Sequence, residues 1–336
     1  MKPGRAGPSG SGFFPMRSPL RLHPLAWLLP ALLATLALRA DGGAFPTGKR
    51  VLFFTKSADF EHTVIKDPAQ TPAPKPGGPV PGLAFQVVRA LGEKNRIEFV
   101  CSKDGSLFSA SYLAQFDAFL FFTTGDLTQA GRDGNPPMTP AGKAALLAAV
   151  AGGKGFVGIH SASDTFHSPG NLAAGPSRFQ DDGDRADDYI KMIGGEFIQH
   201  GPQQPSHLIV ADPKFPGAAD VPADVRLLEE WYSLKNFSSD LHVVLVQETA
   251  GMVGSEYARP NYPSTWARMH GRGRVFYTNL GHRDDVWQGA LFQSVLMGGI
   301  NWALGRVDAD LKPNLALVAP GAPVLPPYVP PPSLRN

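Results

Sequence analysis

The chain has 336 residues, of which 43% are hydrophobic and 18% charged, and its formal net charge is +2. This length and apolar content allow one large domain with a substantial core and argue against wholesale disorder. Lysine and arginine are scattered and form no basic stripe of the kind that binds phosphate backbones, so we expect no nucleic-acid partner. The single cysteine, Cys101, excludes an internal disulfide and any site built from several thiolates.

The N-terminal residues follow the order of a secretory signal. Arg17 and Arg21 precede the apolar stretch Leu25–Leu38, and small residues follow that stretch. The stretch is short for a membrane span, and Pro30 interrupts it. We therefore predict a signal peptide and leader over residues 1–44, export to the periplasm or the cell exterior, and no stable membrane span after cleavage. An uncleaved membrane anchor is the alternative.

Seven short apolar runs follow, of the kind typical of strands that are buried on both faces. They are Val51–Thr55, Arg96–Cys101, Ala118–Thr123, Gly155–His160, Leu208–Ala211, His242–Val246 and Arg274–Thr278. Helical patterns lie between several of them, at Leu83–Leu91, Pro140–Val150, Asp187–Ile193 and, as a long closing helix, Val286–Leu304. Alternating strands and helices predict an α/β domain over residues 49–306, with a doubly wound, mostly parallel sheet.

Three segments do not fit this core. Pro68–Pro81 is a proline- and glycine-rich loop, and the polar segment Ser168–Asp184 is expected to form a flap near the functional site. Residues 307–336 form a proline-rich C-terminal tail, in which Pro320–Pro332 can form neither a helix nor a central strand.

Polar side chains cluster just after the expected strands. In a doubly wound sheet the carboxyl ends of the strands share one edge, and ligands bind there. The residues concerned are His62, Thr124, Asp126, His160, Asp164, His200, Gln203, Glu229, Glu230, Tyr232 and His282. We expect most of them to lie close together. The other histidines, His167, His207, His242 and His270, are interpreted as structural or exposed.

His160 is the sharpest candidate among these residues. It ends the run Gly-Phe-Val-Gly-Ile-His and precedes Ser161–Asp164, which could open a helix. Hydrolases and amidotransferases place their nucleophile at such a strand–turn–helix position, and N–H groups at the helix start would favour an anion or a polarised oxygen. A histidine there could act as a general base, a metal ligand or a hydrogen-bond donor. A buried histidine that only satisfies the turn is the alternative.

The four histidines His62, His160, His200 and His282 could together bind a divalent metal, since neutral imidazole suits zinc, nickel or iron. No His-x-x-x-His pair or other short metal-binding spacing occurs, so a divalent metal is left open as a cofactor. Glu229 or Glu230 could serve as an acid or base while the neighbouring aromatic rings face a sugar. A solvated pair beside a core aromatic residue is the alternative for the two glutamates.

With these residues collected, the chain resembles the ThuA-like (trehalose utilisation) family, whose fold is of the class I glutamine amidotransferase type. The resemblance covers about residues 50–305. Its motifs are Gly152–Ala162, Ile193–Phe197, His200 with Gln203, Glu229–Tyr232, Gly273–His282 and Gly298–Ala303. It implies a flavodoxin-like sheet with His160 where amidotransferases have a cysteine. We therefore expect no glutaminase activity, because the acyl intermediate needs a thiolate.

The resemblance also implies a role in the metabolism of trehalose and of oxidised (keto) disaccharides, with a small carbohydrate as the partner. The leading hypothesis is an exported enzyme that performs acid/base chemistry on a sugar or keto-sugar, with His160, His282, Asp164 and Glu230 as catalytic residues. The predicted substrate-binding residues are His62, Thr124, Asp126, His200, Gln203 and Tyr232. The alternatives are a carbohydrate-binding accessory module without turnover and a metal-dependent hydrolase. A homo-oligomer is left open.

Overall fold

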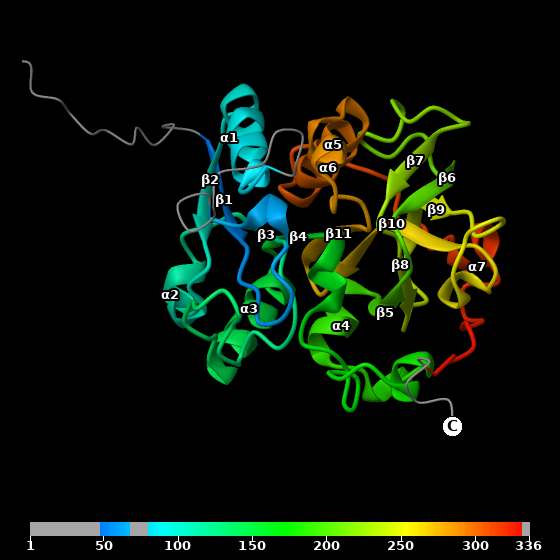
Figure 1. The fold of residues 1–336 in the computed structure, drawn as a ribbon. Helices are drawn as coiled ribbons and strands as arrows, with labels where there is room; N and C mark the ends of the chain where they lie inside the picture. Colours follow the sequence, from blue (N-terminus) through cyan, green and yellow to red (C-terminus); the bar gives the residue numbers. More distant parts are fainter. Residues whose placement is uncertain (1–47, 68–79, 331–336) are drawn as a thin grey trace, which may run out of the picture. The chain divides into compact units, whose positions relative to one another are not determined.

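The structure is a computed structural model that describes residues 48–67 and 80–330 (Figure 1). The predicted signal and leader, most of the loop Pro68–Pro81 and the last residues of the tail lie outside the described residues. Nine strands form one sheet: β1 (Lys49–Phe54), β2 (Ile97–Ser102), β3 (Ala118–Phe121), β4 (Gly155–Ile159), β6 (Gln204–Val210), β7 (Arg226–Glu229), β9 (His242–Gln247), β10 (Tyr262–His270) and β11 (Gly273–Thr278). The strands β5 (Glu196–His200) and β8 (Tyr232–Lys235) form a separate antiparallel pair.

The helices are α1 (Leu83–Asn95), α2 (Ala110–Leu113), α3 (Pro140–Ala151), α4 (Asp188–Ile193), α5 (Asp284–Gln288), α6 (Ala290–Ala303) and α7 (Leu315–Val318). At the start of α3, Thr139 accepts a hydrogen bond from the N–H of Gly142, and Pro140 occupies the first turn. The expected closing helix Val286–Leu304 is instead two helices, because Gly289 between them has an extended backbone. None of the helices in the described ranges has the length and apolar character needed to cross a membrane.

The sheet order is β2-β1-β3-β4-β11-β10-β9-β6-β7, and its first five strands are parallel. Counted along the chain, these five have the order 2-1-3-4-5 of flavodoxin-like folds, so the predicted α/β class and parallel core are confirmed. The other four strands are antiparallel, including those over the runs Leu208–Ala211 and His242–Val246. No crossover helix separates β9, β10 and β11, and a two-residue turn joins β10 to β11, so these strands pair as hairpins.

Helices cover both faces of the parallel half, as Figure 1 shows. The residues of β1 alternate between the two layers. Val51 and Phe53 pack in one hydrophobic cluster with residues of α1 and α6. Leu52 and Phe54 pack in the other with residues of α3 and α4. This double burial explains why the strands are continuous apolar runs, and it leaves the strand ends as the places where polar side chains can gather.

The C-terminal tail packs against the domain as far as the structure describes it. The short helix α7 begins after Asn314, whose side chain pairs with the backbone of Val243 in β9 as a neighbouring strand would. The carbonyl of Ala322 accepts a 2.6 Å hydrogen bond from the buried guanidinium of Arg259. Residues 307–330 are therefore part of the packed unit, although they follow the boundary expected at residue 306.

We predict that Asn314→Leu lowers the free energy of unfolding by about 2 kcal/mol, because it leaves the buried N–H and C=O groups of Val243 without partners. Urea unfolding followed by circular dichroism would measure the change. Leu317→Ala is the matched control in the same short helix, since Leu317 is 82% exposed and its loss should have little effect. Equal stability of the two variants would contradict the role given to the tail.

Candidate functional site

Four side chains from distant parts of the chain meet at the carboxyl edge of the parallel strands. His62 lies in the loop after β1, His160 directly after β4, and His282 in the turn after β11. Glu230 lies between β7 and β8, where the chain passes from the large sheet to the small one. One donor atom from each of the four lies within 4.8 Å of the others. The site is therefore built from loops that only the folded sheet brings together.

The backbone of His160 turns sharply at the end of β4. Its φ is +44°, in the left-handed region that residues other than glycine rarely adopt, and the hydroxyl of Tyr277 donates a 2.7 Å hydrogen bond to its carbonyl. The predicted turn is present, but it leads into a five-residue 3-10 helix, His160–Asp164, which is too short to supply the expected anion-binding N–H groups. What the turn presents to the site is the imidazole.

The ring of His160 is oriented by one backbone group. Its Nδ1 lies 2.9 Å from the carbonyl oxygen of Asn279, so Nδ1 carries the proton and donates. Nε2 is then left with its lone pair, facing Glu230 at 3.5 Å. The other ring nitrogen of a metal-binding histidine commonly makes a hydrogen bond of this kind, which fixes the orientation of the ring. The sequence analysis assigned no role to Asn279, although the residue lies within the motif that ends at His282.

Glu229 is the second residue whose role was missed. It is fully buried, and its carboxylate accepts hydrogen bonds from the backbone N–H groups of Gly281 (2.9 Å), His282 (3.2 Å) and Glu230 (2.8 Å). Burial nevertheless raises its pKa to about 7. Glu229 thus ties the β7–β8 crossing to the turn after β11 and sets the spacing between two members of the site. Neither glutamate is solvated, so the interpretation as a solvated pair was wrong.

Three imidazole nitrogens of the site have no hydrogen-bond partner within the described residues: Nδ1 of His62, Nε2 of His160 and Nδ1 of His282. The carboxylate oxygen Oε2 of Glu230 lies 2.9 Å from Nδ1 of His282, yet this contact lacks hydrogen-bond geometry. A buried polar atom without a partner is costly, and three in one place indicate that something outside the protein completes the site.

The charges at the site are strongly shifted. Burial, together with the neighbouring histidines, holds the pKa of His62 well below its usual value, and burial also lowers the pKa of His160. Burial would raise the pKa of Glu230, but the adjacent His160 and His282 outweigh it and lower that pKa strongly. The lowered pKa values of His62 and His160 favour neutral imidazoles, and that of Glu230 favours an ionised carboxylate, which are the protonation states that metal binding requires.

Aromatic rings surround the four donors. Tyr232 covers the ring of His160 at a centroid distance of 4.1 Å, and Phe122 packs against His62 at 5.1 Å. Behind Phe122 lies Trp287, whose indole N–H donates to the carbonyl of Gly281. Tyr232 is buried and forms a wall of the site. Its contact with a substrate stays a prediction. An apolar surround of this kind strengthens the electrostatic interactions inside it.

His200 lies outside the set of four donors. Its side chain is 43% exposed, and its Nδ1 lies 3.4 Å from the second carboxylate oxygen of Glu230, Oε1. The fourth candidate metal ligand is therefore Glu230, and not His200 as the sequence analysis predicted. Gln203 is exposed nearby and accepts a 2.5 Å hydrogen bond from Arg283. Both residues lie where the site opens to solvent.

Three other predicted site residues form hydrogen bonds outside the four-donor site. The hydroxyl of Thr124 donates to the carbonyl of Phe60, and the carboxylate of Asp126 accepts hydrogen bonds from the N–H and hydroxyl of Thr128 within its own turn. Asp164 was expected to assist a site histidine, but its carboxylate lies 2.7 Å from Nε2 of His167. The polar groups of these residues hold the loops together, and the function proposed below gives them no role in substrate binding or catalysis.

His167 is a buried structural residue, as the sequence analysis interpreted it. Its two ring nitrogens face two carboxylates, Asp164 at 2.7 Å and Glu196 at 3.1 Å, so the imidazolium form fits this position. Burial alone would lower its pKa, but the two hydrogen bonds outweigh burial and raise it. The pKa of Glu196 is lowered to about 2, because the bonds to His167 and Ser168 outweigh its burial. The segment Ser168–Asp184 is anchored to this cluster.

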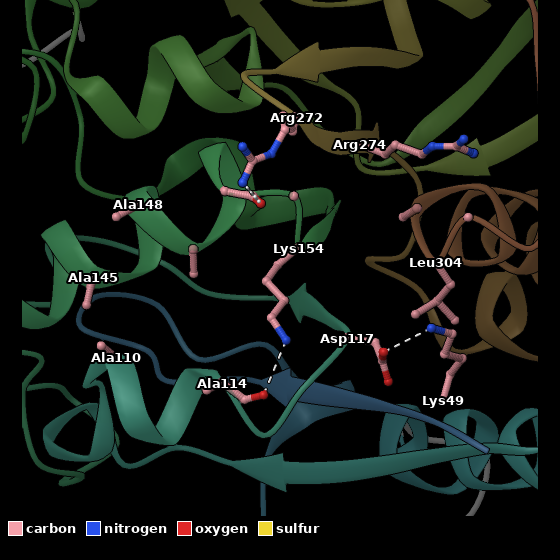
Figure 2. A pocket seen from close by; sticks show the side chains of 15 residues that line it. Lys49, Ala110, Ala114, Asp117, Ala145, Ala148, Lys154, Arg272, Arg274 and Leu304 are labelled. Carbon is pink, nitrogen blue, oxygen red and sulfur yellow. Dashed lines mark hydrogen bonds and ion pairs between the residues drawn. The ribbon is translucent and has the colours of Figure 1, made fainter. Parts of the chain in front are cut away.

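A cavity of about 710 Å³ lies at the opposite edge of the sheet, beside the amino ends of β1, β4 and β11 (Figure 2). Cations line it, which at first suggests an anion site. However, Lys154 donates to the carbonyl of Ala114 after α2, Arg272 to that of Gly152 after α3, and Arg274 to that of Trp302 in α6. The cations thus cap the negative ends of three helices. The cavity is explained by the fold and is separate from the histidines.

The four donors fit a metal ion chemically. Imidazole nitrogens with a carboxylate suit divalent zinc, nickel or iron. The four donor atoms lie within 4.8 Å of one another, so small side-chain rotations would let them share one ion. His62, His160, Glu230 and His282 would hold it, and the part-exposed face of His282 would leave access for a further ligand.

The fold and the site define an α/β protein with a histidine- and carboxylate-lined centre at the carboxyl edge of a flavodoxin-like sheet. A model of the ThuA family, described as trehalose utilisation, matches residues 50–303. The chain therefore belongs to the ThuA family, as the sequence motifs predicted.

Two solved structures are similar to the chain. A ThuA-like protein from Bacteroides uniformis ATCC 8492 has a TM-score of 0.55 and 17% identity, covering 82% of this chain and 99% of that one. A ThuA-like protein from Parabacteroides merdae ATCC 43184 has a TM-score of 0.48 and 16% identity, covering 78% and 92%. No match was found among curated protein sequences. At such identities the first similarity shows the fold alone.

The buried His167 cluster predicts a pH-dependent stability. Because the folded-state pKa of His167 is raised, its stabilisation is complete below about pH 6.5 and is lost as the pH rises through the folded-state value. Urea unfolding of metal-free wild type and His167→Gln should therefore differ most at pH 6 and progressively less toward pH 9. Glu196, with a pKa of about 2, does not titrate in this range. A difference that stays constant with pH would show that His167 is not charged in the folded protein.

Proposed function

We propose that this protein is a metal-dependent enzyme that performs acid/base chemistry on a sugar or keto-sugar. The observation that carries the proposal is the convergence of three unpartnered imidazole nitrogens and one carboxylate oxygen within 4.8 Å in a largely buried site. Imidazole lone pairs beside a carboxylate suit a divalent cation, and these three nitrogens have no hydrogen-bond partner within the described residues. Glutamine amidotransferase activity is not part of the proposal, because His160 stands where the thiolate would be needed.

A divalent ion in this site would act as a Lewis acid, polarising a carbonyl or hydroxyl oxygen of the substrate. The lone pairs of His160 and His282 are then occupied, so these residues serve as ligands and cannot also accept a proton. We assign the acid/base role to His200, which lies 3.4 Å from Glu230 and is exposed at the opening of the site. An imidazole is suited to proton transfer near neutral pH. Tyr232 and Phe122 exclude water behind the ligands.

The carbohydrate substrate is supported by the family, whose description is trehalose utilisation. Polarisation beside a carbonyl acidifies the neighbouring C–H group, so a keto-sugar is the substrate class that such a centre suits best. We further propose that the protein acts outside the cytoplasm. The support is the sequence order in residues 1–44, with Arg17 and Arg21 before the short apolar stretch Leu25–Leu38.

We predict that the chelator-treated protein binds a single equivalent of Zn²⁺ in isothermal titration. His160→Ala and His282→Ala each remove a ligand and should weaken binding by more than about 100-fold, whereas Glu229→Gln, which only disturbs the support of His282, should fall in the range of roughly 10–100-fold. His200→Ala is the matched control and should bind Zn²⁺ as the wild type does. Circular dichroism would verify that each variant is folded. Unchanged binding in His160→Ala would rule out this site.

The same variants separate metal binding from turnover. With keto-disaccharides as substrates and product formation followed by NMR, His160→Ala should lose activity together with the metal. His200→Ala should keep the metal and lose roughly 10²–10⁴-fold in turnover, the contribution typical of an acid/base group. Chelation should abolish wild-type activity and added metal should restore it. Sugar binding without any product in the metal-loaded wild type would instead favour a carbohydrate-binding accessory module.

A further inference from the structure

A second cavity, of about 450 Å³, lies beside the site. Its volume is in the range of small-molecule pockets, and its walls combine aromatic rings with a few polar groups. The residues that line it are Ala174, Gly175, Arg178, Phe179, Phe197, Ile198, Gln199, His200, Tyr328 and Val329. It is thus formed by the loop after β4, by strand β5 and by the C-terminal tail, three segments that come together at the lower right of Figure 1.

The cavity and the four-donor site are separated by very few side chains. His200 lines the cavity, and its Nδ1 is 3.4 Å from Oε1 of Glu230, whose other oxygen faces His160 and His282. Phe197 also lines the cavity and packs on Tyr232 at 4.1 Å, while Tyr232 packs on His160. A molecule with one end at the donors would therefore reach the cavity over Glu230 and His200.

The walls select for a neutral ligand with hydroxyl groups. Arg178 is the one charged residue among the lining residues, and its guanidinium is occupied by the carbonyls of Asn171 and Leu172 and lies 3.8 Å from Asp164. It has no spare capacity for an anion. By contrast, the amide oxygen of Gln199, Nε2 of His200 and the hydroxyl of Tyr328 have no partner within the described residues.

Rings line the same space. Tyr328 of the tail packs edge-on against Phe179 at 5.3 Å, and Phe197 stacks near His200 at 6.2 Å. Aromatic faces beside hydrogen-bonding groups are what a pyranose ring requires, because its C–H faces are apolar and its edge carries hydroxyls. The geometry points to this cavity as the subsite for the second sugar ring of a disaccharide whose first ring lies at the four donors. The inference rests on the proposed function and assigns a position to the second ring of the substrate.

The test compares a disaccharide with a monosaccharide glycoside, using trehalose and methyl α-glucoside titrated calorimetrically into the Zn²⁺-loaded full chain. The wild type should bind trehalose about tenfold more tightly, as one added aromatic contact allows. Tyr328→Ala should remove that advantage and leave methyl α-glucoside unaffected. Gly175→Trp should do the same by filling the cavity, since the backbone of Gly175 is extended and a Cβ there meets no atom within 4 Å.

Leu172→Trp is the matched control, because Leu172 is 54% exposed on the same loop and does not line the cavity. It should bind both sugars as the wild type does. Unchanged trehalose binding in both Tyr328→Ala and Gly175→Trp, with methyl α-glucoside still bound, would overturn the subsite and leave the proposed function standing. Failure of the Zn²⁺-loaded wild type to bind either sugar or its keto form would overturn the proposed function, and the subsite with it.

Discussion

The hydrogen bond from Nδ1 of His160 to the carbonyl of Asn279 is the constraint on which the site depends. It fixes which nitrogen of the imidazole keeps its lone pair, and it does so with a backbone group that cannot titrate. The side chain of Asn279 also forms hydrogen bonds with the backbone of Tyr232. Asn279 therefore connects the ends of β4 and β11 to the small sheet. The orientation of His160 and the position of its aromatic cover are thus set by one residue.

The sheet explains why the candidate site lies at one of its edges. Helices run antiparallel to the strands they follow, so their negative ends gather at the amino edge. There, Lys154, Arg272 and Arg274 donate hydrogen bonds to carbonyls at three helix ends. At the carboxyl edge the strands end in loops, and three of these loops each present a histidine. Glu229 then brings in the carboxylate of Glu230 by binding the backbone of the turn at His282. The 710 Å³ cavity is therefore a consequence of the fold, whereas the 450 Å³ cavity is lined by His200, which lies 3.4 Å from Glu230.

The sequence predicted the parallel half of the fold well, because strands buried on both faces are continuous apolar runs and Thr139 marks the start of α3. It predicted that His62, His160 and His282 meet, because each follows a strand. In the rest of the fold it predicted strands at β6 and β9 but not their antiparallel pairing, and it missed β5, β7, β8 and β10. It gave Asn279 no role, and it took Glu229 as a possible acid or base, because a carboxylate that binds three backbone N–H groups looks in sequence like any other glutamate.

A histidine at the sharp turn after β4 changes what this fold can do. A thiolate there attacks a carbonyl carbon, while an imidazole whose Nδ1 is already bonded offers a single lone pair, fixed in direction and buried. One such lone pair would be a poor base, because burial penalises the charged form that it would become on accepting a proton. Three imidazole lone pairs beside the carboxylate of Glu230 instead favour a bound cation, whose charge the carboxylate partly balances. In the proposed function, proton transfer therefore falls to a group that solvent reaches, and His200 lies between the donors and the aromatic cavity.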